Sequence, residues 1–591
     1  MKTNANAKEK ANAKANAKAK ANANANAKAK AKAKAKVNAK AKAKVNANAN
    51  ANANAKANVK AEAEQNEWTS VMMWEELKEF YRGKRVLVTG HTGFKGSWLT
   101  VLLSLCGAQV YGYALKPPTE PSLFECLYGK GAGARTQQDL TVRISDGAWN
   151  RDAKAKMGFG FSKDAFIGVR RSCIADICDF ETLKAFYEEV RPDVVLHLAA
   201  QPIVLESYQN PRGTYETNVM GTVNLLECAR LLPGCRSLLN VTTDKVYLNE
   251  ERPGYGYKED DRLDGYDPYS NSKSCSELVT HSYAASFLRA QGTAVSTARA
   301  GNVIGGGDFA KDRIIPDCVR AAGAGKDILL RNPNSTRPYQ HVLEPLAVYL
   351  TIAMRQAQDA ARYAGWYNVG PDDCDCVTTG ELADLFVNAW EKATSGEMEA
   401  EKETSGMAEI QRAEQGGETL QREAETGRTE AGREISGQAE AKQEKQDGES
   451  LREEKMRQSG TGTEASDQAE PKRVKQDGES LREEKPWQSG TGRDGLDELL
   501  RTEPAENAES KHQLRWVSAV PQTGKPAPHE ANFLKLDNTK AKEVLGWRPV
   551  WHIGQAVQAT AEWSAAWING GEAEVNATLI RQIRDYFSSG C

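Results

Sequence analysis

Residues 84–96 read Lys-Arg-Val-Leu-Val-Thr-Gly-His-Thr-Gly-Phe-Lys-Gly, a β-rich run followed by three closely spaced glycines. The first six residues are typical of a buried strand, and the stretch from Ser97 to about Cys106 is typical of a helix. At such a junction glycines permit a sharp turn and close backbone approach, while the helix N-terminus presents free N–H groups. We therefore predict that a dinucleotide pyrophosphate binds residues 90–96.

Further strand-like and helix-like runs alternate along the chain on both sides of this junction. Strands are expected at Gln109–Ala114, Val194–Leu198, about Ser237–Val241 and Ala294–Arg299, with helices at about 212–231 and 275–290. This alternation is typical of a parallel α/β sheet. The predicted fold class is α/β: a Rossmann-type doubly wound parallel sheet with a smaller C-terminal α/β substrate-binding domain.

Composition divides the 591 residues into segments of very different character. Residues 1–66 hold sixteen lysines and three glutamates, no aromatic residue, and neither Leu nor Ile. Residues 394–510 are rich in charged residues and glycine, and repeat Lys-Gln-Asp-Gly-Glu-Ser-Leu-Arg-Glu-Glu-Lys from Lys445 and again from Lys475. Neither segment carries enough apolar surface to offset the entropy of ordering, so both are expected to be disordered.

The predicted domains follow from these boundaries. They are a low-complexity tail at 1–66, a nucleotide-binding domain at 67–300 with a surface insertion at about 128–170, a substrate-binding domain at 301–393 and 511–591, and an acidic insertion at 394–510. The tail is interpreted as an inert extension or as one that attracts polyanions nonspecifically. A specific nucleic-acid partner is not expected.

The cysteine pattern and the length of the apolar runs indicate in which cellular compartment the protein is expected. Eleven cysteines are scattered without framework spacing, and neither Cys173/Cys178 nor Cys374/Cys376 matches a zinc or thioredoxin-type motif. We expect reduced thiols, no metal site and a cytoplasmic protein. No run approaches the ~20 apolar residues of a membrane-spanning helix.

Tyr269-Ser-Asn-Ser-Lys273 places a phenol and an amine four residues apart, on one face of a predicted helix. Lys273 is expected to lower the pKa of Tyr269 and to hold the nicotinamide ribose, so that Tyr269 can take a proton from a substrate hydroxyl. Upstream, Thr243 closes a strand and is placed to hydrogen-bond the same hydroxyl. Asp244 and Lys245 add a carboxyl and an amine, an acid and a base beyond what plain dehydrogenation requires.

Two features of the cofactor region leave alternatives open. The acidic residue usually found about 20 residues after the glycines is missing, and Lys116 at the end of the second strand favours a 2′-phosphate or is simply a solvated lysine. The sequence therefore does not decide between NAD and NADP. Asp176 either receives the adenine amino group or caps a turn.

Several motifs together closely resemble the CDP-glucose 4,6-dehydratases, extended short-chain dehydrogenases/reductases of the NAD-dependent epimerase/dehydratase family. They are Gly90-His-Thr-Gly-Phe-Lys-Gly-Ser-Trp98, Ala199-Ala-Gln-Pro202, Thr217-Asn-Val-Met-Gly-Thr222, Thr243-Asp-Lys245, Tyr266-Asp-Pro-Tyr-Ser-Asn-Ser-Lys273, Arg299-Ala-Gly-Asn-Val-Ile-Gly-Gly-Gly-Asp308, Arg337-Pro-Tyr-Gln-His-Val-Leu-Glu-Pro345 and His529-Glu-Ala-Asn532. The resemblance covers 67–393 and 511–591. The Thr-Asp-Lys triplet is its most discriminating part, because sugar epimerases lack the acid/base pair.

The resemblance implies a hydro-lyase with bound NAD that converts CDP-glucose to CDP-4-keto-6-deoxyglucose for deoxysugar and surface polysaccharide biosynthesis, as a homodimer. It implies Tyr269 as the base at the C4 hydroxyl, assisted by Thr243 and Lys273, with Lys245 as the base at C5 and Asp244 as the acid at the C6 hydroxyl. The implied cofactor-binding residues are Gly90, Thr92, Gly93, Phe94, Lys95, Gly96, Asp176, Ile177, Leu198, Ala199, Ala200, Tyr269 and Lys273. The candidate substrate-binding residues are Gln201, Asn302, Arg331 and Arg337.

Two competing interpretations stay open at this point. The first is another nucleotide-sugar dehydratase or a 4-epimerase on the same scaffold, which Asp244 and Lys245 disfavour. The second is a non-catalytic dinucleotide-binding sensor, which has no use for Thr243, Tyr269 and Lys273. The family commonly has Arg where Leu205 stands here, which places one substrate contact in doubt.

Overall fold

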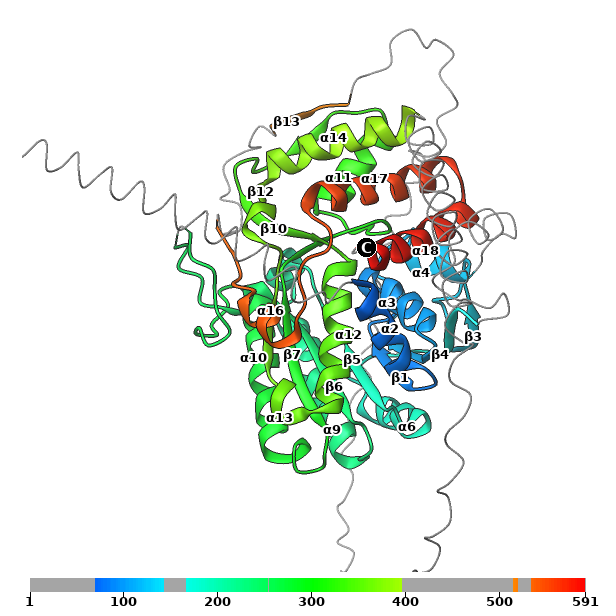
Figure 1. Cartoon of the computed structure of the whole chain (residues 1–591), viewed down its shortest axis with the longest axis vertical. Coiled ribbons are helices and arrows are strands. Elements are labelled where there is room, and N and C mark those ends of the chain that lie inside the picture. The colour runs from blue at the N-terminus through cyan, green and yellow to red at the C-terminus, as the bar shows by residue number, and fades with distance from the viewer. Residues whose placement is uncertain (1–69, 143–165, 253, 396–513, 519–532, 590–591) are drawn as a thin grey trace, which may run out of the picture. The chain divides into compact units, whose positions relative to one another are not determined.

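The computed structural model describes residues 70–142, 166–252, 254–395, 514–518 and 533–589. Three parts of the sequence discussed above lie outside these residues or nearly so. They are the predicted tail at 1–66, nearly all of the predicted insertion at 394–510, and the His529-Glu-Ala-Asn532 motif. The helices and strands below are labelled as in Figure 1.

An eight-stranded sheet in the order β11-β7-β6-β5-β1-β2-β4-β3 confirms the predicted Rossmann-type fold (Figure 1). Its strands are β1 (Arg85–Thr89), β2 (Gln109–Ala114), β3 (Gln137–Thr141), β4 (Gly168–Ile174), β5 (Val194–His197), β6 (Ser237–Thr243), β7 (Ala294–Ala300) and β11 (Trp366–Val369). All neighbouring strands are parallel except the β3–β4 pair. The strand order reverses at β1, and folds of this kind bind ligands at the carboxyl ends of the strands beside that point.

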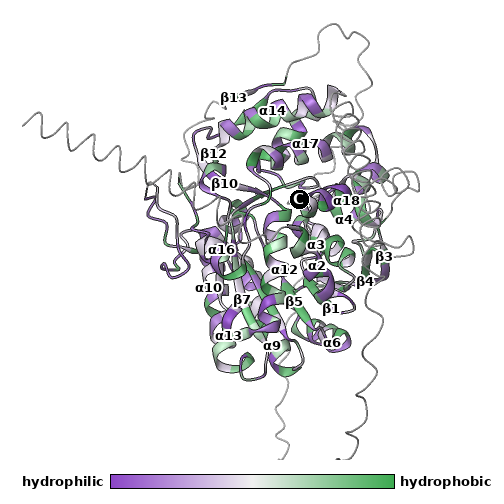
Figure 2. Ribbon diagram, in the orientation of Figure 1, coloured by the Kyte–Doolittle hydropathy of each residue, from purple (hydrophilic) through white to green (hydrophobic). Residues whose placement is uncertain are grey.

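Helices cover both faces of this sheet because alternate residues of a strand point to opposite sides. Val86 and Val88 of β1 pack in one hydrophobic cluster, whereas Leu87 between them belongs to a second. The first cluster includes residues of α2 (Ser70–Tyr81), α3 (Phe94–Leu105) and α12 (Leu343–Gln358). The second includes residues of α6 (Phe180–Val190), α9 (Gly221–Leu231) and α10 (Pro268–Tyr283). In Figure 2 the hydrophobic colour of β5 matches its position between these two clusters.

The second half of the chain builds smaller sheets and a third core. A three-stranded sheet has the order β12-β10-β8, and a two-stranded sheet pairs β13 with β9. Their strands are β8 (Asn302–Ile304), β9 (Ile328–Leu330), β10 (Thr336–His341), β12 (Cys376–Thr378) and β13 (Trp516–Ser518). The accompanying helices are α11 (Ile314–Gly323), α14 (Thr379–Ser395), α16 (Thr539–Leu545), α17 (Ile553–Asn569) and α18 (Glu572–Ser588), of which α11, α14 and α17 share the third core.

Short helical elements connect these parts. They are α4 (Leu123–Tyr128), α7 (Val204–Gln209), α8 (Pro211–Tyr215), α13 (Ala360–Tyr363), the π-helical turns η1 (Glu216–Met220) and η3 (Ala284–Leu288), and the 3₁₀ turns η2 (Asp244–Val246) and η4 (Asp373–Asp375). The helix predicted at 212–231 is thus α8 and α9 joined through a π-helical turn. Among the described helices, none combines the length and apolar character needed to cross a bilayer.

The surface insertion at about 128–170 stays a prediction, and its residues 143–165 lie outside the described part of the chain. Residues 137–141 form the edge strand β3, and β4 begins at Gly168. Leu140 and Val169 pair across these strands and are buried, so this region extends the sheet. The domain boundary at residue 300 stays a prediction, but β11 returns to the large sheet beyond it by pairing with β7.

Candidate active site

The glycine loop between β1 and α3 depends on two close backbone contacts. Gly90 has φ +76°, and a Cβ there would lie 2.7 Å from the backbone nitrogen of Ala199, next to β5. A Cβ on Gly96 would overlap the carbonyl oxygen of Gly90. Gly93 is the N-cap residue of α3, and its backbone is extended. The loop therefore brings the first turn of α3, with its free N–H groups, to the carboxyl end of β1.

The two residues between the first two glycines hold the loop to its neighbours. His91 is buried and its Nε2 lies 2.7 Å from the Ser172 hydroxyl, while a Cβ on Gly112 would overlap its ring. Burial lowers the pKa of His91 to about 3, so its imidazole stays neutral. The Thr92 hydroxyl donates to the carbonyl of Leu115 at 2.8 Å. This role of His91 could not be predicted from the sequence, because its partner Ser172 lies 81 residues away along the chain.

Asp176 and Ile177, the predicted adenine-side residues, follow β4. Asp176 is exposed, and its Oδ1 accepts the backbone N–H of Cys178 at 2.9 Å. This is the turn-capping geometry that the sequence left open as an alternative. Ile177 is buried, and it fills the space that a side chain at Gly221 would need. Lys116 lies exposed after β2.

Beyond β5, Leu198, Ala199 and Ala200 pass beside the glycine loop. The Ala199 N–H donates to the Thr89 hydroxyl at 3.2 Å. His197 is a core histidine with both ring nitrogens engaged, because they lie 2.7 Å from Thr89 Oγ1 and 3.0 Å from Thr222 Oγ1. Burial lowers the pKa of His197 to about 3.

Thr243, Asp244 and Lys245 stand at the carboxyl end of β6 and in η2. The Thr243 hydroxyl donates to Asp244 Oδ1 at 2.8 Å. Asp244 is only 1 % exposed, and its other oxygen, Oδ2, has no hydrogen-bond partner among the described residues. Burial raises the pKa of Asp244, although Lys245 and Arg337 draw it down. Asp244 is therefore a buried carboxyl with a raised pKa and one oxygen without a hydrogen-bond partner among the described residues.

Tyr269 and Lys273 lie one turn apart near the start of α10. The helix begins there because Pro268 occupies its first turn and the Asp267 side chain accepts the Ser270 N–H at 3.0 Å. The Lys273 ammonium donates to the carbonyl of Val241 on β6 at 3.2 Å.

The pKa values of this pair are shifted mainly by burial. Burial raises the pKa of Tyr269 to about 12, although a hydrogen bond with Thr243 and the charge of Arg313 lower it. Burial lowers the pKa of Lys273 to about 8, and Lys95 lowers it further. The pKa of Tyr269 is thus raised rather than lowered as predicted, because burial outweighs the hydrogen bond with Thr243 and the charge of Arg313, and Asp244 and Asp267 raise the pKa further.

Further charges surround this cluster. Burial lowers the pKa of Lys95 to about 8, and Arg313 lowers it further, whereas Asp244 and Asp308 raise it. Arg313 precedes α11 and pairs with Asp308 at 3.0 Å. Sequence analysis assigned no role to Arg313, because only the tertiary fold brings the start of α11 toward Tyr269.

Beneath Lys273, Glu277 and Arg299 form a buried ion pair that sequence analysis also missed. Arg299 donates through Nε to Glu277 Oε1 at 2.9 Å and through Nη2 to Oε2 at 2.7 Å. The hydroxyls of Thr242 and Thr297 donate to the same carboxylate. The pair joins α10 to β6 and β7 one turn below the ammonium of Lys273.

The candidate substrate-binding residues separate into three environments. Arg337 on β10 lies close enough to Asp244 to lower its pKa, and Asn302 on β8 pairs in register with Tyr339 of β10. Arg331 forms an exposed ion pair with Asp312 at 3.2 Å. The amide of Gln201 is engaged within its own loop, accepting from the N–H of Ile203 at 2.6 Å and donating to Thr214 at 2.9 Å.

Comparisons with known proteins place the chain in a family. Residues 86–370 match the model of the NAD dependent epimerase/dehydratase family. The chain is 43% identical to CDP-glucose 4,6-dehydratase of Salmonella typhimurium over 318 residues, which span 53% of this chain and 78% of that protein. It is 28% identical to dTDP-glucose 4,6-dehydratase of Haemophilus influenzae over 26% of this chain and 46% of the relative. A solved dTDP-glucose 4,6-dehydratase of Bacillus anthracis in complex with NAD aligns with TM-score 0.43 and 15% identity, over 81% of this chain and 95% of that one.

Proposed function

The chain belongs to the NAD dependent epimerase/dehydratase family, and on that premise we propose that it dehydrates CDP-glucose to CDP-4-keto-6-deoxyglucose with NAD as an internally recycled cofactor. The reaction loses one water, and its net redox change is zero. The proposed substrate rests on the 43% identity with the Salmonella typhimurium enzyme.

One observation carries this proposal: a buried acid with a free oxygen stands beside the oxidising pair. Oxidation at C4 needs a base for the hydroxyl proton, but elimination of the C6 hydroxyl also needs an acid for the leaving oxygen. Asp244 meets that requirement, because its pKa is raised and its Oδ2 has no partner among the described residues. A 4-epimerase or a sensor has no use for such a group.

The residues around the glycine loop fit a dinucleotide. Gly90 and Gly96 close the turn so tightly that no side chain fits at either position, which brings the α3 N-terminus toward a pyrophosphate. Lys273 is buried at the end of β6, where we propose that it also contacts the nicotinamide ribose. When bound, NAD supplies a hydride acceptor for C4 and a hydride donor for C6.

Three side chains divide the proton transfers. We propose that Tyr269, hydrogen-bonded to Thr243, removes the C4 hydroxyl proton. The 4-ketone acidifies the C5 hydrogen, which Lys245 removes; the same side chain would return a proton to C5 when C6 receives the hydride. Asp244 donates its proton to the C6 oxygen, and water leaves. The charge of Arg313 favours the phenolate form of Tyr269, and Arg337 beside Asp244 is the proposed contact for the nucleotide diphosphate.

A homodimer and a cytoplasmic location are part of the proposal. Four large hydrophobic residues are exposed on neighbouring helical elements, and we propose that these elements form the dimer interface: Met220 of η1, Leu231 of α9, Leu278 of α10 and Phe287 of η3. Light scattering tests the dimer: a monomeric mass at micromolar concentration contradicts it.

The decisive test is incubation with CDP-glucose and no added reductant, with the product followed by mass. We expect loss of one water, abolished in Tyr269→Phe and strongly reduced in Asp244→Asn and Lys245→Ala. In D₂O we expect the product to gain one deuterium at C5. Glu188→Gln, which changes an exposed carboxyl on α6 in the same way, serves as the matched control and should keep full activity. An unchanged mass or an epimer with CDP-glucose contradicts the proposal.

A further inference from the structure

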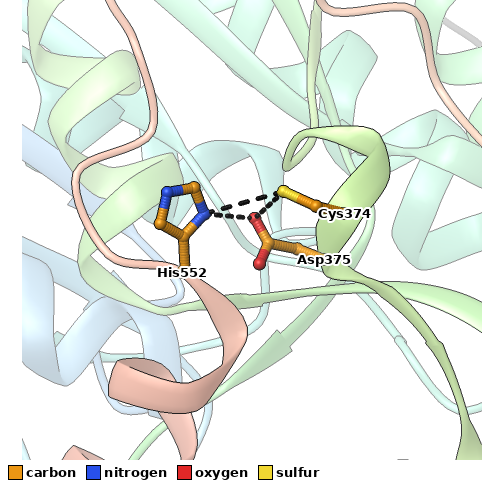
Figure 3. A group of neighbouring side chains, drawn as sticks. All are labelled: Cys374, Asp375 and His552. Atoms are coloured by element: carbon orange, nitrogen blue, oxygen red, sulfur yellow. Dashed lines mark hydrogen bonds and ion pairs between the residues drawn. The ribbon is translucent and has the colours of Figure 1, made fainter.

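Cys374, Asp375 and His552 converge at the N-terminus of α17, far from the proposed reaction centre in sequence (Figure 3). Cys374 and Asp375 lie in η4, and His552 immediately precedes α17. Cys374 Sγ is 3.8 Å from His552 Nδ1 and 3.7 Å from Asp375 Oδ2, and these last two atoms are 3.0 Å apart. All three side chains point toward one another in Figure 3.

We propose that these three side chains bind Zn²⁺, with a fourth position open to water. Thiolate, imidazole and carboxylate are the ligand types that zinc takes in proteins. Tetrahedral zinc with bond lengths of about 2.0–2.3 Å places its ligand atoms about 3.3–3.6 Å apart. The three observed separations depart from that range by about 0.3 Å at most, so only small side-chain rotations are needed.

Asp375 is already fixed as a ligand. Its side chain is 3 % exposed, and its Oδ1 accepts the backbone N–H of Ile553 at 2.8 Å. Oδ2 is therefore the oxygen left to face Cys374 and His552. Anchoring one oxygen in this way orients the other, as outer hydrogen bonds do around protein metal sites.

The other carboxylates of this loop already have cationic partners. Asp373 pairs with Lys535 at 2.6 Å, and Asp372 pairs with Lys542. Asp375 has no lysine or arginine partner among the described residues, and it faces an imidazole and a thiol instead. The side chain of His552 is 59 % exposed and Cys374 is exposed, which gives the ion an entry path and water as a fourth ligand.

Zinc bound to these three side chains would tie η4 to the N-terminus of α17. The chain passes directly from η4 into β12, which pairs with β10 next to Arg337. Zinc would therefore stabilise the position of η4 and of the paired strands β12 and β10, and Arg337 lies on β10. The inference rests on the three ligands alone and does not depend on the proposed dehydration.

Equilibrium dialysis of the full-length protein against Zn²⁺ tests the site, with Co²⁺ as a spectroscopic substitute. We expect one equivalent of zinc whose affinity falls at least about tenfold in Cys374→Ser and in His552→Gln. We also expect a thiolate-to-cobalt charge-transfer band that disappears in Cys374→Ser. Cys178→Ser is the matched control. It removes another exposed cysteine, one that belongs to no possible metal-ligand group among the described residues, and it should change neither the zinc affinity nor the cobalt band.

Because Cys374 and His552 are both exposed, neither substitution removes core packing, and circular dichroism in the absence of metal checks that both variants fold. Zinc binding that is absent, or equally strong in the wild type and both ligand variants, overturns the site. So does a cobalt spectrum without a thiolate band, or one lost equally in Cys178→Ser.

Discussion

Glu277 on α10 and Asp244 at the end of β6 are both buried carboxyl groups, yet their surroundings are opposite. Both oxygens of Glu277 accept hydrogen bonds from Arg299, and threonine hydroxyls add two more. Although burial alone raises the pKa of Glu277, the nearby imidazole of His281, 3.5 Å from Oε2, the charge of Arg299 and these bonds bring it to about 2. Asp244 has one bonded oxygen, and burial raises its pKa.

The difference indicates two kinds of work. A fully paired buried ion cannot exchange protons at neutral pH, so the Glu277–Arg299 pair is suited to holding α10 against the sheet. A buried carboxyl with one unbonded oxygen and a raised pKa is suited to acid catalysis and contributes little to stability.

The largest effect should be on catalysis. We expect Tyr269→Phe and Asp244→Asn to lower kcat for CDP-glucose by about 10²–10⁴-fold, because each removes a proton-transfer group. The free energy of unfolding should change by less than about 1 kcal/mol in Asp244→Asn, since the amide can still accept from Thr243. Product mass and urea unfolding measure the two quantities. Retained activity in Asp244→Asn would remove this residue from the reaction.

The buried ion pair should show the converse. We expect Arg299→Met to lower the free energy of unfolding by about 3–5 kcal/mol, because Glu277 is left as an unpaired buried charge. The double variant Glu277→Gln/Arg299→Met should recover part of that loss. Glu188→Gln, which breaks the exposed pair with Arg191, should cost about 1 kcal/mol or less. An equal loss in the buried and exposed variants would contradict the contrast.

The two carboxyls should also give opposite pH dependence. The folded pKa of Glu277, about 2, lies below its unfolded value of about 4.3, so its contribution to stability is present above pH 4.3 and is lost as pH falls toward 2. Glu277→Gln should therefore flatten the acid limb of stability. The raised pKa of Asp244 has the opposite sign: its contribution is present at low pH and is lost as pH rises through the folded pKa. Asp244→Asn should therefore gain stability relative to wild type as pH rises.

The smallest effect separates the two arginine candidates. We expect Arg337→Ala to raise KM for CDP-glucose at least about tenfold, since it lies beside Asp244. Arg331→Ala should change KM by less than about threefold and the free energy of unfolding by less than about 1 kcal/mol, because its ion pair with Asp312 is exposed. Steady-state kinetics decide between them. A larger KM effect for Arg331→Ala would place the diphosphate beyond β9.

Much of the fold could be predicted because its signals are local. The β1 strand, the glycines and α3 are contiguous, and β2 was predicted with its observed bounds. The placement of Tyr269 and Lys273 on one face of a helix could be predicted because residues four apart in an α-helix lie on the same face. The extent of β3 and β4 could not be predicted. Residues 137–141 pair with residues 168–172, and the sequence between the two strands has no hydrophobic periodicity that would indicate the pairing.

The sequence by itself determined which residue types stand at the carboxyl ends of the strands, since alternating strands and helices fix where those ends lie. Only the tertiary structure decided how those residues are charged and paired. Burial with one oxygen left without a partner raises the pKa of Asp244, whereas Arg299, on another element, donates to both oxygens of Glu277 and helps to hold its pKa at about 2. Cys374 and His552 are 178 residues apart, and no spacing rule joins them. Burial and long-range pairing depend on the packing of distant segments, which a local pattern does not contain.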